Sequence, residues 1–293
     1  MRLIDMHSHW GTERGWRGNP AGGKKAFAAL QKYFNWHDGF VTEAHMAEYF
    51  RNSNARVVLD LAFTQNLPMD EVRDQHDYSF ATERAYPDVI LGHWIHLDPF
   101  KPESIGELRR CIDKRVGFVG MHINSTPPAT DPIWEPYYRL CLEANIPVMI
   151  LVGMSAIGAG VRGGLGRILD HTHPRYLDEV AAKYADLNII AARPAWPWQA
   201  EMNAVAIHKG NIWYELHGWS PKYHPPELKY EIARRLQDKV MFAADYPMLP
   251  YERMIKDWRD QGYTEDVLEK VFHRNAEAFF DMIGLKLPAP KQA

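Results

Sequence analysis

Eight short apolar runs recur along the chain, and an amphipathic stretch follows each of them. The runs occupy residues 2–6, 56–61, 89–95, 117–123, 146–152, 187–193, 211–216 and 239–245. The stretches between them have apolar residues at three- and four-residue spacing, which indicates helices. Apolar strands separated by single helices are typical of parallel strands buried on both faces, and eight such units favour closure into a (β/α)8 barrel. We therefore predict a single TIM-barrel domain over residues 1–293.

Two segments are longer than a minimal barrel needs. Residues 10–41, which contain Gly and Trp, follow the first predicted strand, and the Gly-rich residues 153–172 follow the fifth. Segments that follow barrel strands lie at the C-terminal face, where active sites of this fold are built. We therefore expect both insertions to border the active site. No G-x-G-x-x-G motif follows the first strand, which counts against a dinucleotide-binding fold.

Charge and composition narrow the class of partner. The 34 basic and 37 acidic residues are interspersed and give a formal net charge of -3, so no basic stripe indicates nucleic acid or an anionic membrane. The two cysteines are too few for a disulfide framework. No secretory signal opens the chain, and no apolar run approaches the roughly 20 residues of a membrane span. We expect a cytoplasmic protein with a small-molecule substrate.

The motif LIDMHSHW places two histidines, His7 and His9, at the end of the first strand. Residues two apart in a strand face the same side, so both side chains can point into the barrel mouth. Imidazoles placed in this way suit zinc or another divalent first-row metal, although two ligands alone bind it weakly. Asp245 ends the eighth strand and is therefore expected at the same face.

Four segments, in order along the chain, resemble a known family. They are LIDMHSHW, HPRYLDEVAAKYADLNIIAARPAWPW, VMFAADYPM and VFHRNAEAFF. They are similar to the amidohydrolase-related group that contains aminocarboxymuconate semialdehyde decarboxylase and other aromatic-acid decarboxylases, hydratases and lactonases. The resemblance implies a distorted TIM barrel, commonly oligomeric, with one zinc or manganese ion. It also implies that His7, His9 and Asp245 bind this metal, together with a histidine ending strand 5, and that a catalytic histidine ends strand 6.

Two positions depart from this pattern. Leu151 stands where the strand-5 ligand is expected, and Arg193 stands at or near the position of the catalytic histidine. Leucine offers no metal ligand, and an arginine that stays cationic cannot be a general base and would repel a divalent ion. Whether a zinc or manganese ion is bound is therefore an open question at this point.

Three alternatives follow from these substitutions. In the first, Arg193 occupies the space of the metal, pairs with Asp245 and binds a substrate carboxylate through two hydrogen bonds. In the second, another histidine supplies the missing ligand, either His122 or His217. In the third, the alignment is shifted and the His171/His173 pair returns into the site.

Other side chains near the strand ends are candidates for substrate binding. Trp196 and Trp198 lie in a Pro-rich loop after strand 6, and we expect them to wall the pocket. Arg193, His122 and His217 complete the expected substrate-binding set. His93 and His96 are three residues apart in a strand segment, so at most one of them can face inward.

The expected function is that of an amidohydrolase-superfamily hydrolase acting on a small carboxylated, aromatic or cyclic compound. In this interpretation Asp245 activates water, with or without a metal, and Arg193 is the electrophilic clamp. The first alternative is a metal-dependent, non-oxidative decarboxylase, which in the family depends on the strand-6 histidine that this chain lacks. The second is a catalytically inactive barrel that binds a ligand.

Overall fold

The barrel contains all eight predicted strands. The computed structural model describes residues 1–16, 23–36, 39–61, 63–124 and 126–287. The strands are β1 Leu3–His9, β2 Ala55–Asp60, β3 Ile90–Ile95, β4 Phe118–Ile123, β5 Val148–Leu151, β6 Ile189–Ala192, β7 Ile212–Glu215 and β8 Val240–Met241. They pair in parallel in sequence order from β1 to β8. The predicted (β/α)8 architecture is confirmed.

The ring closes between β1 and the segment that follows the short strand β8. The Met6 amide donates to the Phe242 carbonyl at 3.0 Å, and the Asp245 amide donates to the His7 carbonyl at 3.0 Å. These bonds link the two ends of the sheet where β8 itself has only two residues. They also fix Asp245 beside the C-terminal end of β1.

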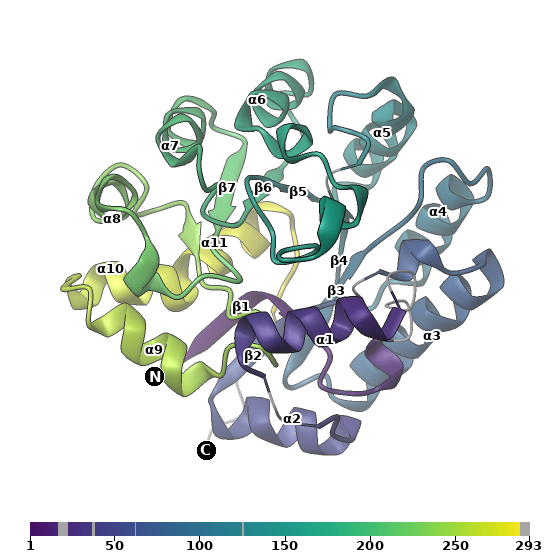
Figure 1. Ribbon diagram of the computed structural model, residues 1–293, viewed down its shortest axis with the longest axis horizontal. Helices are drawn as coiled ribbons and strands as arrows, with labels where there is room; N and C mark the ends of the chain where they lie inside the picture. The colour runs from purple at the N-terminus through teal and green to yellow at the C-terminus, as the bar shows by residue number, and fades with distance from the viewer. Residues whose placement is uncertain (17–22, 37–38, 62, 125, 288–293) are drawn as a thin grey trace.

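Helices surround the strands, as Figure 1 shows. They are α1 Gly23–Phe34, α2 Glu43–Asn52, α3 Met69–Ala85, α4 Ser104–Lys114, α5 Glu135–Ala144, α6 Pro174–Lys183, α7 Gln199–His208, α8 Pro226–Ile232, α9 Tyr251–Arg259, α10 Glu265–Glu269 and α11 Asn275–Met282. Inside the barrel, Ile4, Met149 and Ile190 form an apolar cluster with Phe279 and Phe280 of α11. The barrel interior is therefore a packed core, and chemistry is confined to its C-terminal mouth.

Both insertions lie at this mouth. In Figure 1, α1 crosses in front of the barrel, and the loop after β5 approaches it from the other side. Their side chains, which include Trp16, Phe34 and Ile157, line one pocket with residues from the strand ends. The described parts of residues 10–41 and 153–172 thus border the candidate site, as the sequence predicts.

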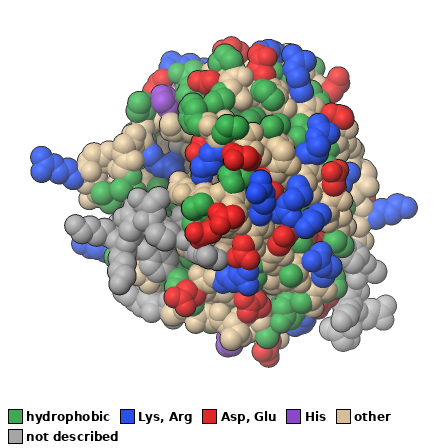
Figure 2. Space-filling model, turned by 90° about the vertical axis from the view of Figure 1, so that its right-hand side faces the viewer, with side chains coloured by type: hydrophobic (Ala, Val, Ile, Leu, Met, Phe, Trp, Pro, Cys, Tyr) green, Lys and Arg blue, Asp and Glu red, His purple; other side chains and the backbone are tan. Residues whose placement is uncertain are grey.

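Charged side chains of both signs are mixed over the face shown in Figure 2, with no broad area of one charge. Among the described residues, no helix is long and apolar enough to cross a membrane. Cys111 and Cys141 are buried free thiols, in agreement with the absence of a disulfide framework in the sequence.

An ion-pair network outside the barrel mouth joins α3 to α4. Glu107 accepts hydrogen bonds from Arg110 Nη2 and from His76 Nδ1, each at 2.7 Å. Burial raises the pKa of Glu107, but these two partners outweigh it and lower the pKa to about 2. Because the folded-state pKa lies below the ordinary value of 4.5, this carboxylate stabilises the fold above about pH 4.5 and loses that effect as pH falls toward 2.

We expect Glu107→Gln to lower the free energy of unfolding by about 2 kcal/mol at pH 7. The difference from the wild type should shrink as pH falls from about 4.5 toward 2, because in this range the carboxyl group of the unfolded wild-type chain takes up a proton before that of the folded chain does. Urea unfolding at several pH values measures it. Glu135→Gln, in an exposed pair with Lys183, is the control and should leave the free energy of unfolding nearly unchanged, because water and salt screen an exposed ion pair. A constant gap between wild type and Glu107→Gln from pH 7 to 3 would contradict the assignment.

Candidate active site

Asp60, the last residue of β2, lies at the centre of a group of buried histidines. Its Oδ2 atom is 2.6 Å from His96 Nε2 and 2.8 Å from His122 Nδ1. Burial raises the pKa of Asp60, but His96, His7 and His122 outweigh it and hold this pKa well below its ordinary value. Asp60 is therefore an ionised carboxylate in the barrel mouth. The sequence analysis missed it, although a carboxylate that ends the apolar run RVVLD was a usable signal.

His7 and His9 both point into the mouth from β1, as predicted. His7 Nε2 lies 3.9 Å from Asp60 Oδ2, and His9 Nδ1 lies 3.6 Å from Asp60 Oδ1. The two rings are nearly perpendicular, at 86°. Asp5 holds this end of β1 in place by accepting hydrogen bonds from Ser8 Oγ at 2.5 Å and the amide of Ala244 at 3.2 Å.

Asp245 contacts His9 from the β8 side of β1, whereas Asp60 contacts it from the β2 side. The Asp245 Oδ1 atom is 3.0 Å from His9 Nε2. Burial lowers the pKa of His9, but Asp245 and Asp60 outweigh it, so that this pKa is raised above its ordinary value. Asp245 has a left-handed backbone with φ of 69°. Such a conformation is costly in a residue other than glycine and is found most often at functional sites.

Arg193 follows β6 and has the same kind of backbone, with φ of 80°. Its side chain is buried, and no carboxylate of the described residues lies within 4.0 Å of its guanidinium. The expected ion pair between Arg193 and Asp245 is thus not formed. Asp245 Oδ1 faces His9 instead, and Oδ2 lies near Gly218 together with Arg193 Nη1. A buried guanidinium without a carboxylate partner can bind an anionic ligand group.

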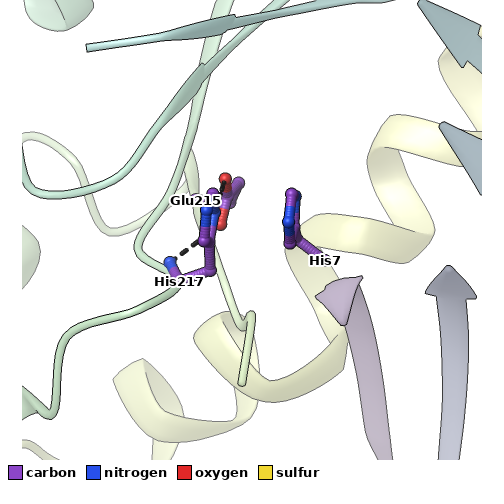
Figure 3. Close-up of side chains that lie close together, drawn as sticks. All are labelled: His7, Glu215 and His217. Carbon is purple, nitrogen blue, oxygen red and sulfur yellow. Dashed lines mark hydrogen bonds and ion pairs between the residues drawn. The ribbon is translucent and has the colours of Figure 1, made fainter. Parts of the chain in front are cut away.

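His217 stacks on His7, as Figure 3 shows, with 3.6 Å between ring centroids and 5° between planes. Glu215 accepts from the His217 amide at 2.9 Å and lies 2.5 Å from its Nδ1. Burial lowers the pKa of both stacked histidines well below the ordinary value and raises that of Glu215 well above it. Both rings are therefore neutral near pH 7. The prediction that His217 enters the site agrees with this placement.

These side chains line one narrow pocket at the mouth. Its walls also include Trp16, Phe63 and Met248, and its open volume is about 30 Å³, room for about one or two water molecules. A larger space of about 320 Å³ adjoins it through the shared wall residues Leu151 and Ile157. The second space has the size of a small-molecule site.

Several expected residues lie elsewhere. Trp196 is 45% exposed, and neither it nor Trp198 lines the pocket at the mouth. Trp196 packs against Trp219, and Trp198 packs against His173. The sequence indicated a Pro-rich loop near the site, but it could not show that this loop turns outward. The aromatic walls are Trp16 and Phe34 of the first insertion and Phe63 after β2.

The histidine pairs are separated as strand and helix geometry requires. His96 faces Asp60, whereas His93 lies 3.0 Å from Glu83 Oε2 outside the barrel. His173 accepts from the Arg175 amide at the start of α6. Neither it nor His171 lines the pocket, so the return of this pair into the site is not observed.

The ligand set that the family resemblance implies is incomplete here. Leu151, at the strand-5 position, lies buried on the pocket wall and offers no donor atom. Among the described residues, three side-chain groups at the mouth could hold a divalent metal. Two contain Asp60, one with His7 and His9 and the other with His96 and His122, and the third is His7, Glu215 and His217.

Gly218 keeps Arg193 and Asp245 in place. A Cβ atom there would lie 2.2 Å from Arg193 Nη1 and 3.0 Å from Asp245 Oδ2, and φ is +75°. If the pocket is catalytic, we expect Gly218→Ala to lower kcat/KM about tenfold by displacing the guanidinium. Steady-state kinetics measure it, with Gly210→Ala as the control because nothing lies within 4 Å of a Cβ at that position. Equal kinetics for the two variants would contradict this role.

Comparisons with solved structures give the same architecture. An uncharacterized TIM-barrel protein from Bordetella bronchiseptica is 19% identical, with a TM-score of 0.75 over 97% of this chain and 100% of that chain. A 5-carboxyvanillate decarboxylase from Novosphingobium aromaticivorans, complexed with manganese and 4-hydroxy-3-methoxy-5-nitrobenzoic acid, is 19% identical, with a TM-score of 0.68 over 96% of each chain. At these identities the likeness concerns the fold.

Sequence comparisons give the family. A curated 2-keto-4-carboxy-3-hexenedioate hydratase from Sphingobium sp. is 34% identical over 83 residues, which are 24% of this chain and 24% of the hydratase. The chain thus matches about a quarter of that relative's length. The amidohydrolase family model matches residues 4–282. Since this match spans nearly the whole chain, the protein belongs to the amidohydrolase family.

Proposed function

We propose that this chain is a hydrolase for a small cyclic or aromatic compound that carries a carboxylate. The observation that carries the proposal is that a buried carboxylate and a buried guanidinium line the same pocket. Asp245, in contact with His9, offers a proton acceptor, and Arg193, with no carboxylate of the described residues within 4.0 Å, offers a cationic anchor. A base and an anion anchor in one enclosed site are the groups that water attack on a carbonyl requires.

Each of these residues has a distinct part in the proposed reaction. Asp245 takes the proton of a water molecule that attacks the carbonyl carbon. His9, whose pKa is raised by Asp245 and Asp60 against the effect of burial, then donates a proton to the leaving oxygen. Arg193 binds the substrate carboxylate through two hydrogen bonds and so fixes the carbonyl beside the water.

The two adjoining spaces suggest how the substrate lies. The pocket beside Asp245 has room for about one or two water molecules, whereas the space behind Leu151 and Ile157 has about 320 Å³. We place the attacking water in the first and the ring of the substrate in the second. Arg167 borders the second space and donates to Asn124 Oδ1 at 3.0 Å, so a positive charge lies at each end of the proposed substrate path.

A divalent ion, zinc or manganese, would add Lewis-acid polarisation of the carbonyl oxygen. The His7/His9/Asp60 group is suited to hold it by its donor atoms. The parts assigned above to Asp245, His9 and Arg193 are properties of the chain itself.

Non-oxidative decarboxylation is the second candidate, and the enclosure of the pocket favours it. A cavity of about 30 Å³ walled by Trp16 and Phe63 excludes bulk water, which suits the release of CO2 more than the consumption of water. In this case the Asp245–His9 pair would deliver the proton that replaces the carboxylate on the ring carbon.

A panel of carboxylated lactones, carboxylated phenols and muconate-type acids distinguishes these reactions. Products would be followed by mass spectrometry and by CO2 release. We expect a ring-opened acid from at least one lactone, without CO2. CO2 release from a phenolic acid would support the decarboxylase, and a folded protein that turns over no compound of either class would contradict both candidates.

A further inference from the structure

We propose that His7, His9 and Asp60 form a three-ligand site for a divalent cation of the zinc class. This site would take the place of the strand-5 and strand-8 ligands that the family resemblance implies. The proposal concerns binding of the ion and not turnover, so it can be tested without a substrate.

The spacing of the donor atoms fits a single ion. Ligand atoms about 2.1 Å from a tetrahedral zinc ion lie about 3.4 Å from one another. His7 Nε2 is 3.9 Å from Asp60 Oδ2, and His9 Nδ1 is 3.6 Å from Asp60 Oδ1. These separations are too long for hydrogen bonds, and they are close to the distance between two ligand atoms of a tetrahedral zinc ion. Small rotations of the side chains would complete the coordination.

The directions of the donor atoms also converge. A ring nitrogen binds a metal in the plane of its ring, and the His7 and His9 rings are 86° apart, so their lone pairs can meet at one point. His7 Nε2 and Asp60 Oδ1 are buried and have no hydrogen-bond partner among the described residues. Such atoms are costly unless a ligand satisfies them.

Neighbouring residues hold the three ligands in position. His96 and His122 lie 2.6 Å and 2.8 Å from Asp60 Oδ2, which are hydrogen-bond distances and too short for ligands of one ion. Asp245 Oδ1 lies 3.0 Å from His9 Nε2. His9 Nδ1 therefore faces Asp60, where it makes one long contact of 3.4 Å with the Asp60 carbonyl oxygen that a cation would replace. A carboxylate that accepts from the second nitrogen of a ligating histidine is the usual outer partner in zinc sites. Asp245 is therefore a positioning residue here for the metal.

The residues at strands 5, 6 and 8 also explain why the metal ligands that the family resemblance implies would be replaced here. Leu151 fills the strand-5 position, and Arg193 Nη1 lies with Asp245 Oδ2 beside Gly218. A cation bound next to Asp245 Oδ2 would meet the guanidinium charge. Asp60, which ends β2, places the proposed site on the β2 side of His9, away from Asp245, where two histidines fix its carboxylate.

Two other side-chain groups with metal-ligand chemistry fit less well. In the group of His7, Glu215 and His217, the two rings are stacked at 5° (Figure 3), so their in-plane lone pairs run parallel and cannot meet at one ion. In the group of His76, Glu107 and Cys111, the carboxylate is already bound by Arg110. The structure therefore favours the site at Asp60.

Metal binding can be measured without knowing the substrate. The full-length protein would be stripped with a chelator, dialysed, and titrated with zinc by calorimetry, with cobalt absorption as a second readout of the ligand geometry. We expect one zinc per chain in the wild type. Loss of a residue that positions a ligand typically weakens metal binding about 10- to 100-fold. Asp245→Asn should weaken zinc binding within that range, whereas Asp60→Asn, which removes a ligand, should weaken it more than about 100-fold. Asp186→Asn, the matched control at an exposed aspartate in the turn before β6, should bind as the wild type does.

His9→Gln is the second ligand variant and serves if Asp60→Asn fails to fold by circular dichroism. It should lose zinc to the same degree. Two results would overturn the proposal: absence of zinc and cobalt binding by the folded wild type at millimolar metal, or loss of zinc in Asp245→Asn with full retention in Asp60→Asn. The second result would place the ion at the strand-8 carboxylate.

Discussion

Replacing Asp245 by Asn is expected to lower kcat/KM by about 1,000-fold on any substrate that the wild type converts. The amide has nearly the shape of the carboxylate but cannot accept a proton from water. It also removes the negative charge 3.0 Å from His9 Nε2. Burial lowers the pKa of His9, and without the charge of Asp245 to oppose this effect, His9 would lose the proton that it donates in the reaction. Steady-state kinetics and the pH dependence of kcat measure both effects.

The matched control is Asp186→Asn, because Asp186 is an exposed aspartate in the turn before β6, at the other end of that strand from Arg193. It should leave kcat/KM unchanged. Circular dichroism and thermal unfolding of Asp245→Asn would confirm that the variant is folded. If folded Asp245→Asn retained more than about a tenth of the wild-type rate, Asp245 would not be the base, and the proposed reaction would lose its central residue.

Replacing Arg193 by Met is expected to lower kcat/KM about 100-fold, which corresponds to the loss of about 2 to 3 kcal/mol from charged hydrogen bonds. The main effect should fall on KM, because the guanidinium binds a substrate group that does not react. Arg193 is buried and has no carboxylate of the described residues within 4.0 Å, so removal of its charge breaks no ion pair there. The fold should persist.

Two further variants define this role. Arg193→Lys keeps the charge but loses the two-point contact, and it should recover only part of the affinity. Arg109→Met, which removes an exposed arginine of α4, should have the kinetics of the wild type. A substrate analogue without its carboxylate should bind the wild type and Arg193→Met equally. An unchanged KM in Arg193→Met would contradict the anchor.

The barrel could be predicted because its signal is repeated. Eight apolar runs with helices between them leave few alternatives, and all eight strands are present. The positions of His7 and His9 followed from the same logic, since alternation along β1 sends both to one face. Even the separation of His93 from His96 followed from strand geometry.

The contacts between strand ends were harder to predict. Nothing local to Asp60 shows that four histidines from three other strands gather around it. The expected Arg193–Asp245 ion pair is absent, and both residues have left-handed backbones, with φ of 80° and 69°. Sequence periodicity carries no information on such turns. Sequence periodicity also could not show that Trp196 and Trp198, which follow β6, lie outside the pocket at the mouth.

Activation of water in this pocket is tested most directly by turnover in ¹⁸O-labelled water, once the substrate panel has given a substrate. We predict one ¹⁸O atom in the newly formed carboxylate of the wild-type product, with incorporation slowed about 1,000-fold in Asp245→Asn. Product that forms without the label and with release of CO2, or labelled product at an equal rate from Asp245→Asn, would contradict the assignment of Asp245 as the base of a hydrolase.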